Sequence, residues 1–288
     1  MIRLPKGSLP SLVTVTGLLA TLVLLAQTVL AAGAAVDAVN AGAAGATAAQ
    51  VQERLPHDPQ AFTQGLLFHQ GSLLESTGLY GQSSLRRVDP QTGTVLASTR
   101  LPRTIFAEGL ALCPAQPGHR ARLVLLTWRE GRILTFDAKT LRQTGSHHLK
   151  GQGWGLAWDG ARLLLSDGSD TLRLLTPDTF AETGQLKVRD GTQPVRDLNE
   201  LEWVEGWLLA NVWGRDRIAI IHPPDTKNAG QVAAWLDVSA LRQELGPQAE
   251  TANGIAYNPH TRTLFVTGKR WDKTFTLALP PLLNQPPR

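Results

Sequence analysis

The stretch "FAEGLAL" at residues 106–112 places a carboxylate, Glu108, inside an apolar run. Related segments, each with a polar or aromatic residue followed by a small residue and an apolar run, occur five times: "QGLLF" (64–68), "EGLAL" (108–112), "WGLAW" (154–158), "NELEW" (199–203) and "NGIAY" (253–257). Their starts are 44, 46, 45 and 54 residues apart. A period of this length indicates one supersecondary unit repeated five times.

Each repeat contains further apolar runs separated by turn residues. The second run ends in a polar cluster: "LLEST" (73–77), "LLTWR" (125–129), "LLSDG" (164–168), "LLANVW" (208–213) and "LFVTGK" (264–269). Third runs such as "ILTFD" (133–137) and turns such as "DPQTG" (89–93) lead into a fourth run in most repeats. Four short strands per repeat predict an all-β fold, a five-bladed β-propeller with four-stranded blades. The exception is "VSALRQEL" (238–245), which predicts a short helix inserted in blade four.

The segment before the first repeat predicts how the ring closes. "RLPHDPQAFTQGL" (54–66) shares its Arg-Leu-Pro and Phe-x-x-Gly-Leu frame with "RLPRTIFAEGL" (100–110). The chain after Leu279 is rich in proline and offers no further strand. We therefore expect residues near Val51 to Leu55 to supply the outer strand of the last blade.

The N-terminal residues predict a targeting segment that is separate from the folded domain. Arg3 and Lys6 precede an uncharged apolar run, and small residues follow it, which is typical of a signal peptide over residues 1–31. The run is also long enough to span a bilayer as an uncleaved anchor. Residues 32–50 are rich in Ala and Gly and predict a linker with too few large apolar residues to fold. Residues 51–288 then form one propeller domain, periplasmic or secreted in a bacterium if the signal is cleaved.

Charge and cysteine content exclude several classes of function. The formal net charge is +4, and the Lys and Arg residues are scattered without a basic stripe, so nucleic-acid binding is not predicted. Cys113 is the only cysteine, which rules out an intramolecular disulfide and is typical of a small buried hydrophobe. His147 and His148 fall in a predicted outer strand, so we expect both side chains at the protein surface. No histidine spacing matches a helical zinc motif.

The repeat predicts which side chains meet at the propeller axis. The first strand of each blade lines the central channel, so we expect one residue per blade there: Gln64, Glu108, Trp154, Asn199 and Asn253. The second runs are expected to add five more: Glu75, Trp128, Asp167, Trp213 and Lys269. A mixed polar and aromatic set is typical of a small-ligand pocket. The alternative is that these groups satisfy one another and trapped water.

Several motifs resemble the glutaminyl cyclotransferases of the plant and bacterial type: "PHDPQAFTQGLLF", "ESTGLYGQSSLR", "FAEGL", "GWGLAWDG", "LNELEWVEGWLLANVW", "NGIAYNP" and "VTGKRW". They occur in family order from Leu55 to Trp271. The resemblance implies a five-bladed propeller that converts the N-terminal glutamine of peptides and proteins to pyroglutamate and releases ammonia. It also implies that no catalytic metal cofactor is needed, although a structural ion in the channel remains compatible with it.

The same resemblance assigns roles to the axial residues. Glu108 is expected to shuttle a proton from the attacking amine to the leaving nitrogen, helped by a pKa that burial raises. The matching substrate-binding positions are Phe62, Gln64, Phe106, Trp128, Trp154, Asn199, Trp213 and Lys269. Asn253 and Glu75 are supporting positions. For Glu75 two roles are open, because it can order the neighbouring loop or share a proton with Glu108. The register of Trp128 is open because it follows an insertion, "CPAQPGHRAR" (113–122).

Two other functions are compatible with the same residues. One is a calcium-dependent lactonase or esterase, in which four oxygen donors would hold the metal: Glu108, Asn199, Asn253 and Asp167. The other is a propeller that binds peptides without catalysis, because a fold does not determine a function. A monomer is expected. The natural peptides and the preferred second residue are not predicted.

Overall fold

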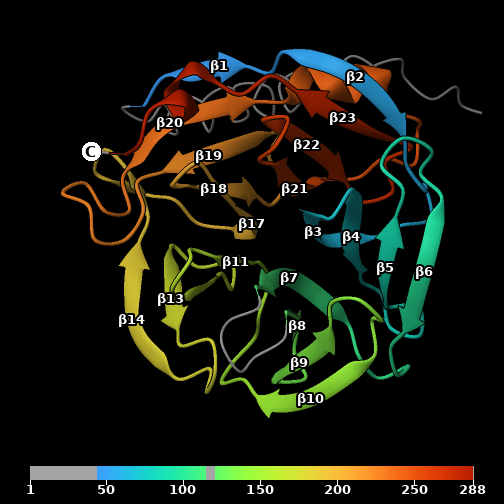
Figure 1. The fold of residues 1–288 in the computed structure, drawn as a ribbon. Coiled ribbons are helices and arrows are strands. Elements are labelled where there is room, and N and C mark those ends of the chain that lie inside the picture. The colour runs from blue at the N-terminus through green and yellow to red at the C-terminus, as the bar shows by residue number, and fades with distance from the viewer. Residues whose placement is uncertain (1–43, 115–120, 288) are drawn as a thin grey trace, which may run out of the picture. The chain divides into compact units, whose positions relative to one another are not determined.

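The computed structural model describes residues 44–114 and 121–287, which form a β-propeller around a central axis (Figure 1). The predicted signal peptide, residues 32–43 of the predicted linker and most of the insertion after Cys113 lie outside the described residues. Among the described residues, no helix combines the length and apolar character needed to cross a membrane.

Five sheets confirm the predicted blades, each with four antiparallel strands, and one of them carries a fifth strand. Blade one contains β3 (Thr63–His69), β4 (Ser72–Thr77), β5 (Ser84–Val88) and β6 (Val95–Arg100). Blade two contains β7 (Ala107–Cys113), β8 (Arg122–Thr127), β9 (Arg132–Asp137) and β10 (Gln143–His148). Blade three contains β11 (Leu156–Trp158), β12 (Leu163–Leu165), β13 (Thr171–Leu175) and β14 (Glu182–Lys187).

The last two blades each take one strand from the N-terminal side. Blade four contains β17 (Leu198–Val204), β18 (Trp207–Val212), β19 (Arg217–Ile221), β20 (Val232–Asp237) and the added β1 (Ala46–Ala48). Blade five contains β21 (Ala252–Asn258), β22 (Thr263–Gly268), β23 (Lys273–Leu277) and β2 (Val51–Pro56). The remaining elements are the hairpin β15 (Arg189–Asp190) and β16 (Gln193–Pro194) and two 3₁₀ helices, η1 (Ser239–Glu244) and η2 (Pro281–Asn284). Helix η1 is the predicted helix, and it follows the last strand of blade four.

Burial follows from the position of each strand in its blade. The inner and middle strands are packed between two neighbouring sheets, so β4 and β18 are buried along their whole length. The outer strands face solvent, and β6 and β10 carry exposed polar side chains. His147 and His148 lie in β10 and are exposed, as predicted. Each pair of neighbouring blades encloses its own apolar cluster, so the core is a ring of five clusters.

Strand β2 closes the ring. It pairs antiparallel with β23, with Leu55 opposite Thr274, which confirms that the N-terminal segment supplies the outer strand of the last blade (Figure 1). The junction between blades one and five is filled by a stacked pair of rings, Phe68 and Phe265, with centroids 5.6 Å apart. Closure therefore combines backbone pairing at the outer edge with apolar packing between the blades.

The prediction that residues 32–50 form only a linker is wrong for their last part. Strand β1 pairs in parallel with β20, with Ala46 opposite Trp235. Backbone hydrogen bonds need no large side chains, so an Ala-rich segment can add to a sheet edge without its own core. The buried Asp190 carboxylate holds this edge, because it accepts hydrogen bonds from the Ala44 amide (2.9 Å) and the Trp235 indole (2.8 Å).

Close approach of the inner strands explains the small residue in each repeat. A Cβ added to Gly155 would lie 1.9 Å from the Asn199 carbonyl oxygen, and one added to Gly109 would lie 2.6 Å from the Gly155 backbone. Only glycine permits this packing. Glu200 is the exception in the repeat. Its carboxylate accepts hydrogen bonds from the backbone amides of Leu66 (3.3 Å) and Ile255 (2.9 Å), so it links three inner strands.

Candidate active site

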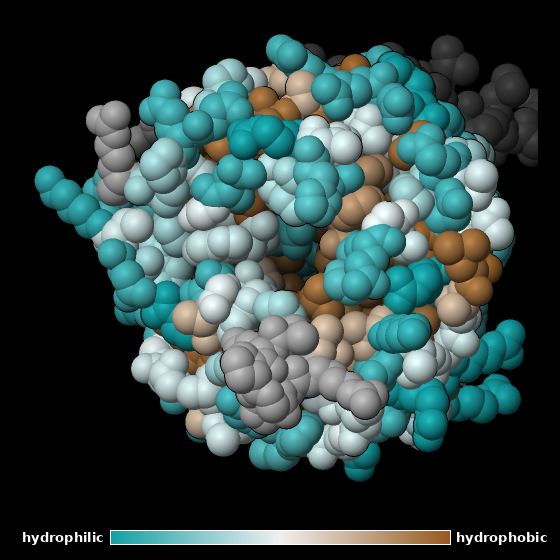
Figure 2. Space-filling view, viewed as in Figure 1, coloured by the Kyte–Doolittle hydropathy of each residue, from teal (hydrophilic) through white to brown (hydrophobic). Residues whose placement is uncertain are grey.

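A cavity of about 350 Å³ opens at the centre of the propeller (Figure 2). The hollow is visible on the face shown, with apolar residues along part of its wall. Its lining residues are Phe62, Gln64, Leu79, Phe106, Glu108, Trp128, Trp154, Asn199, Trp213 and Lys269. The structure thus brings together Glu108 and all eight positions predicted to bind substrate, and it adds Leu79, which sequence reasoning missed. Glu75 and Asn253 do not line the cavity.

A repeated irregularity of the inner strands places the polar residues at the axis. In four blades the pairing with the second strand shifts directly after the first residue of the inner strand: between Thr63 and Gly65, Ala107 and Leu110, Leu198 and Leu201, and Ala252 and Ile255. The second residue of each strand falls in this shift: Gln64, Glu108, Asn199 and Asn253. A bulge re-aims a side chain that regular pairing would place elsewhere.

The second strands contribute a different set from the one expected. Trp128, Trp213 and Lys269 each follow directly after the last residue of β8, β18 and β22. The strand pairings place Gly78 and Gly168, rather than Glu75 and Asp167, at the equivalent points of blades one and three. An added Cβ would lie 2.4 Å from the Phe106 ring at Gly78 and 2.7 Å from the Trp154 ring at Gly168. These glycines therefore make room for two aromatic walls of the cavity.

Glu108 is buried and lines the cavity together with an amide, that of Gln64, and an ammonium group, that of Lys269. The side-chain amide of Gln64 donates a hydrogen bond to Glu108 Oε1 at 3.0 Å. Burial raises the pKa of Glu108 well above its ordinary range, and the positive charge of Lys269 acts in the opposite direction. Burial also lowers the pKa of Lys269, which the Glu108 charge opposes. The cavity thus contains two titratable groups with shifted pKa values, which is typical of functional sites.

Aromatic rings form the walls around these charges. The Phe106 ring contacts three others, Phe62 at 6.1 Å, Tyr80 at 5.4 Å and Trp128 at 5.3 Å between centroids. The Lys269 ammonium lies 4.9 Å from the Phe62 centroid. Such walls exclude water and strengthen electrostatic interactions inside the cavity.

Two lining residues offer unused polar atoms. The Trp154 indole N–H and the Asn199 Oδ1 are buried and have no hydrogen-bond partner among the described residues. Buried polar atoms are normally paired, so these two atoms indicate a ligand with a complementary acceptor and donor. Asn253, which lies beside the cavity, instead donates to the Thr63 carbonyl (3.0 Å) and to Gln64 Oε1 (3.1 Å) and so holds the amide that contacts Glu108.

The possible metal ligands do not gather at the cavity. Within residues 44–114 and 121–287, no three His, Cys, Asp or Glu side chains come together as a metal site. Of the four oxygen donors considered for calcium, only Glu108 and Asn199 line the cavity. Asp167 instead accepts a hydrogen bond from the Ser169 amide, in the turn after β12.

The Glu202 carboxyl is partly buried and lies outside the cavity that contains Glu108. Glu202, on β17, accepts a hydrogen bond from the Tyr257 amide at 3.0 Å. Burial raises the pKa of Glu202 to about 8. The folded protein therefore keeps this proton at pH values where the unfolded chain has lost it, and the proton favours the folded state. Stability from this source is present at low pH and is lost as the pH rises from the ordinary carboxyl range towards about 8.

We expect Glu202→Gln to remove this pH dependence. Relative to the parent, the variant should gain stability as the pH rises, and the difference should level off above about 8. Urea unfolding of both proteins at several pH values measures the effect. Glu53→Gln, at an exposed position of β2, is the control for loss of a charge alone. An unchanged pH dependence in Glu202→Gln would contradict a protonated Glu202 in the folded state.

Fold and site together define a five-bladed propeller with a central cavity that contains a buried carboxyl group, an ammonium group and aromatic walls. The family model for glutamine cyclotransferase matches residues 21–279. The chain is 40% identical over 237 residues to a glutaminyl-peptide cyclotransferase of Arabidopsis thaliana, covering 80% of this chain and 71% of that protein. The crystal structure of Myxococcus xanthus glutaminyl cyclase superposes with a TM-score of 0.72 at 36% identity, covering 81% of this chain and 97% of the other. The chain therefore belongs to the glutamine cyclotransferase family.

Proposed function

We propose that Glu108 acts as the single proton shuttle in the cyclisation of N-terminal glutamine. The enzyme converts the N-terminal glutamine of peptides to pyroglutamate. The observation that carries the proposal is the buried Glu108 carboxyl, held by Gln64 and facing a cavity that also contains Lys269. A carboxyl with a raised pKa both accepts and returns a proton readily near neutral pH.

The reaction balances with one shuttled proton. The α-amine nitrogen forms a bond to the γ-carbonyl carbon and closes a five-membered lactam. Glu108 accepts a proton from this nitrogen and returns it to the leaving amide nitrogen. The bond between the γ-carbon and that nitrogen then breaks, and ammonia departs. No water molecule or external base is consumed.

The lining residues supply the contacts that such a substrate needs. Lys269 stabilises the negative charge that develops on the γ-carbonyl oxygen. Asn199 Oδ1 accepts a hydrogen bond from a substrate N–H, and the Trp154 indole donates one to a substrate carbonyl. The aromatic walls pack against the short aliphatic stem of glutamine. Trp213 is about half exposed at the cavity, where the rest of the peptide leaves the protein.

The proposal also covers metal dependence, localisation and oligomeric state. Catalysis by Glu108 and Lys269 uses no metal. The basic residues and apolar run at the N-terminus support export to the periplasm or the exterior, or an uncleaved membrane tether. The outer strands of the blades are short and carry charged or polar side chains beside the exposed Val95 and Leu96 of β6, and short edge strands favour a monomer.

The test compares two peptides that differ only at the reacting amine. A short peptide beginning with glutamine should release ammonia, and the same peptide with an acetylated α-amine should release none, because its nitrogen cannot attack. Release should be the same with and without EDTA. Ammonia is measured by a coupled assay and pyroglutamate by mass spectrometry. No release from the free-amine peptide would contradict the proposal, and loss with EDTA would point to the metal-dependent hydrolase.

A further inference from the structure

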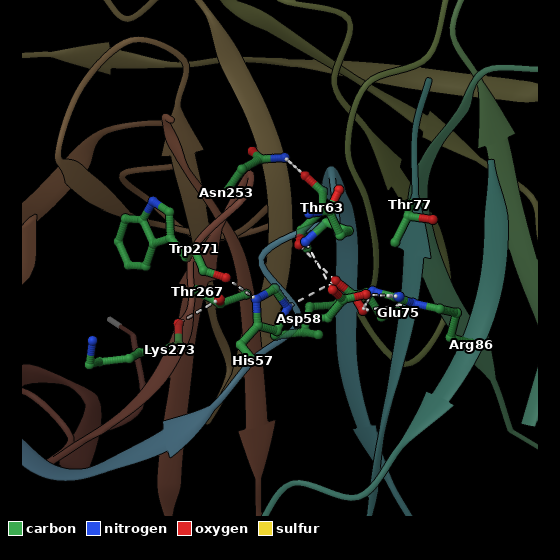
Figure 3. A network of polar contacts seen from close by, with 12 residues as sticks. His57, Asp58, Thr63, Glu75, Thr77, Arg86, Asn253, Thr267, Trp271 and Lys273 are labelled. Carbon is green, nitrogen blue, oxygen red and sulfur yellow. Dashed lines mark hydrogen bonds and ion pairs between the residues drawn. The ribbon is translucent and has the colours of Figure 1, made fainter. Parts of the chain in front are cut away.

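A buried ion network joins blades one and five and includes Glu75 (Figure 3). Both Glu75 oxygens are occupied. Oε1 accepts a hydrogen bond from the Thr63 hydroxyl (2.7 Å) and contacts His57 Nε2 (3.1 Å), and Oε2 accepts from Arg86 Nη2 (2.6 Å) and Nε (3.2 Å). Arg86 also pairs with Asp58 at 2.7 Å. Glu75 is 1% exposed, so this ring of contacts replaces its hydration entirely.

The partners of His57 determine its charge. Nδ1 contacts the Trp271 carbonyl oxygen at 2.7 Å, and Nε2 contacts the Glu75 carboxylate. Both partners are acceptors, so both ring nitrogens carry protons and the ring is an imidazolium. Burial opposes this charge most strongly, but the Glu75 carboxylate and the Trp271 carbonyl together outweigh it and raise the pKa of His57. Burial likewise opposes ionisation of Glu75, yet His57 and Arg86 lower the pKa of Glu75 to about 2. The network is therefore two anions balanced by two cations.

The network joins the two segments that carry the catalytic groups. On one side it holds residues 57–63, which lead directly into Gln64. On the other side it holds the segment after Lys269, through His57 Nδ1 and the Trp271 carbonyl and through the His57 amide and the Asp272 carbonyl (3.1 Å). The Arg270 amide also donates to the Ala61 carbonyl at 2.7 Å. The segment before Gln64 and the segment after Lys269, which are far apart in the sequence, are thus fixed against each other.

One further link reaches the proton shuttle itself. The Thr63 carbonyl accepts a hydrogen bond from the Asn253 amide, which also donates to Gln64 Oε1, and Gln64 donates to Glu108. Thr63 therefore connects to Glu75 through its hydroxyl and to the Gln64–Glu108 pair through its carbonyl. We infer that Glu75 is a positioning residue, which acts through Thr63 and His57 to hold Gln64 and Lys269 in place around Glu108. This inference rests on the proposed role of Glu108.

The milder test removes one hydroxyl. Thr63→Val keeps the shape of the side chain and the ion pairs but deletes the bond to Glu75, whereas Thr63→Ser keeps the hydroxyl. With a peptide beginning with glutamine, we expect Thr63→Val to lower kcat about 10-fold with a smaller change in KM, and Thr63→Ser to stay within about twofold of the parent. Glu75→Gln should lower kcat by about 10-fold to 100-fold. All variants are assayed well below their unfolding temperatures.

Two further readouts separate positioning from other roles of Glu75. Asp190→Asn removes another buried carboxylate, at the outer edge of blade four, and should lower the unfolding temperature without lowering kcat. If Glu75 shared a proton with Glu108, Glu75→Gln would shift the acid limb of the pH profile of kcat/KM. If Glu75 only positions the site, the same variant should lower the plateau of that profile and leave the limb in place. Parental kcat in folded Thr63→Val and Glu75→Gln, or a shifted limb with an unchanged plateau, would overturn the inference. Failure of the parent protein to release ammonia would instead overturn the proposed function.

Discussion

Replacing Glu108 with glutamine is expected to lower kcat by about 10²-fold to 10⁴-fold, the usual contribution of a general acid–base group. Glutamine keeps an oxygen that can accept the hydrogen bond from Gln64, so the cavity should keep its shape. It cannot take a proton from the attacking amine, so the shuttle is lost. Ammonia release from a peptide beginning with glutamine measures the effect, and thermal unfolding checks that the variant is folded.

The pH profile provides a second readout of the same variant. Glu108 must be ionised to accept a proton, so parental activity should fall as the pH drops through the Glu108 pKa, which burial places above the ordinary carboxyl range. The residual activity of Glu108→Gln should lack this limb. Glu202→Gln, which removes a partly buried carboxyl outside the cavity, is the matched control and should keep parental kcat. Near-parental turnover in Glu108→Gln would contradict the shuttle.

Lys269→Met should produce the second large effect, a loss of about 10²-fold to 10³-fold in kcat/KM. The buried ammonium over the Phe62 ring provides the positive charge for the developing oxyanion, and methionine fills its volume without that charge. The same charge holds the Glu108 pKa down, so its removal should move the acid limb of the pH profile to higher pH. Steady-state kinetics across the pH range measure both changes.

The controls for this variant separate charge from packing. Lys269→Arg keeps the charge and should retain more activity than Lys269→Met. Lys273→Met removes a lysine whose ammonium donates to the Glu244 carbonyl (2.6 Å), outside the cavity, and should keep the parental pH profile. An unchanged acid limb in Lys269→Met would contradict a direct electrostatic effect of Lys269 on Glu108.

Much of the active site was predictable because the propeller repeats. Once the five segments were aligned, symmetry placed Gln64, Glu108, Trp154 and Asn199 at one axis, although no two of them are neighbours in the sequence. The limit of this reasoning appears in the second strands. The repeat predicted that Glu75 of blade one is equivalent to Trp128 of blade two. The pairing of Thr77 with Thr63 shows instead that Gly78 occupies the equivalent position. Register depends on hydrogen bonds between strands, which a single run of residues does not reveal.

Other parts of the site depend on contacts between distant residues. Leu79 lies at the cavity, with a positive φ of 81°, only because the turn after β4 folds over Phe106. The partners of Glu75 come from three segments, and nothing in the sequence near Glu75 predicts His57 or the Trp271 carbonyl. Strand β1 was missed because its alanines pair through the backbone alone.

The sequence by itself determined the all-β fold, the number of blades, the closing strand and seven of the side chains that line the cavity, whereas Phe62 and Phe106 were expected there only from the family resemblance. It did so because strand periodicity, turn residues and the repeat are local or regularly spaced signals. Only the tertiary structure decided the register of the second strands, the added strand β1 and the ion network around Glu75. The register and β1 depend on backbone hydrogen bonds between strands. The ion network depends on contacts between blades one and five, where each buried charge must find its partners.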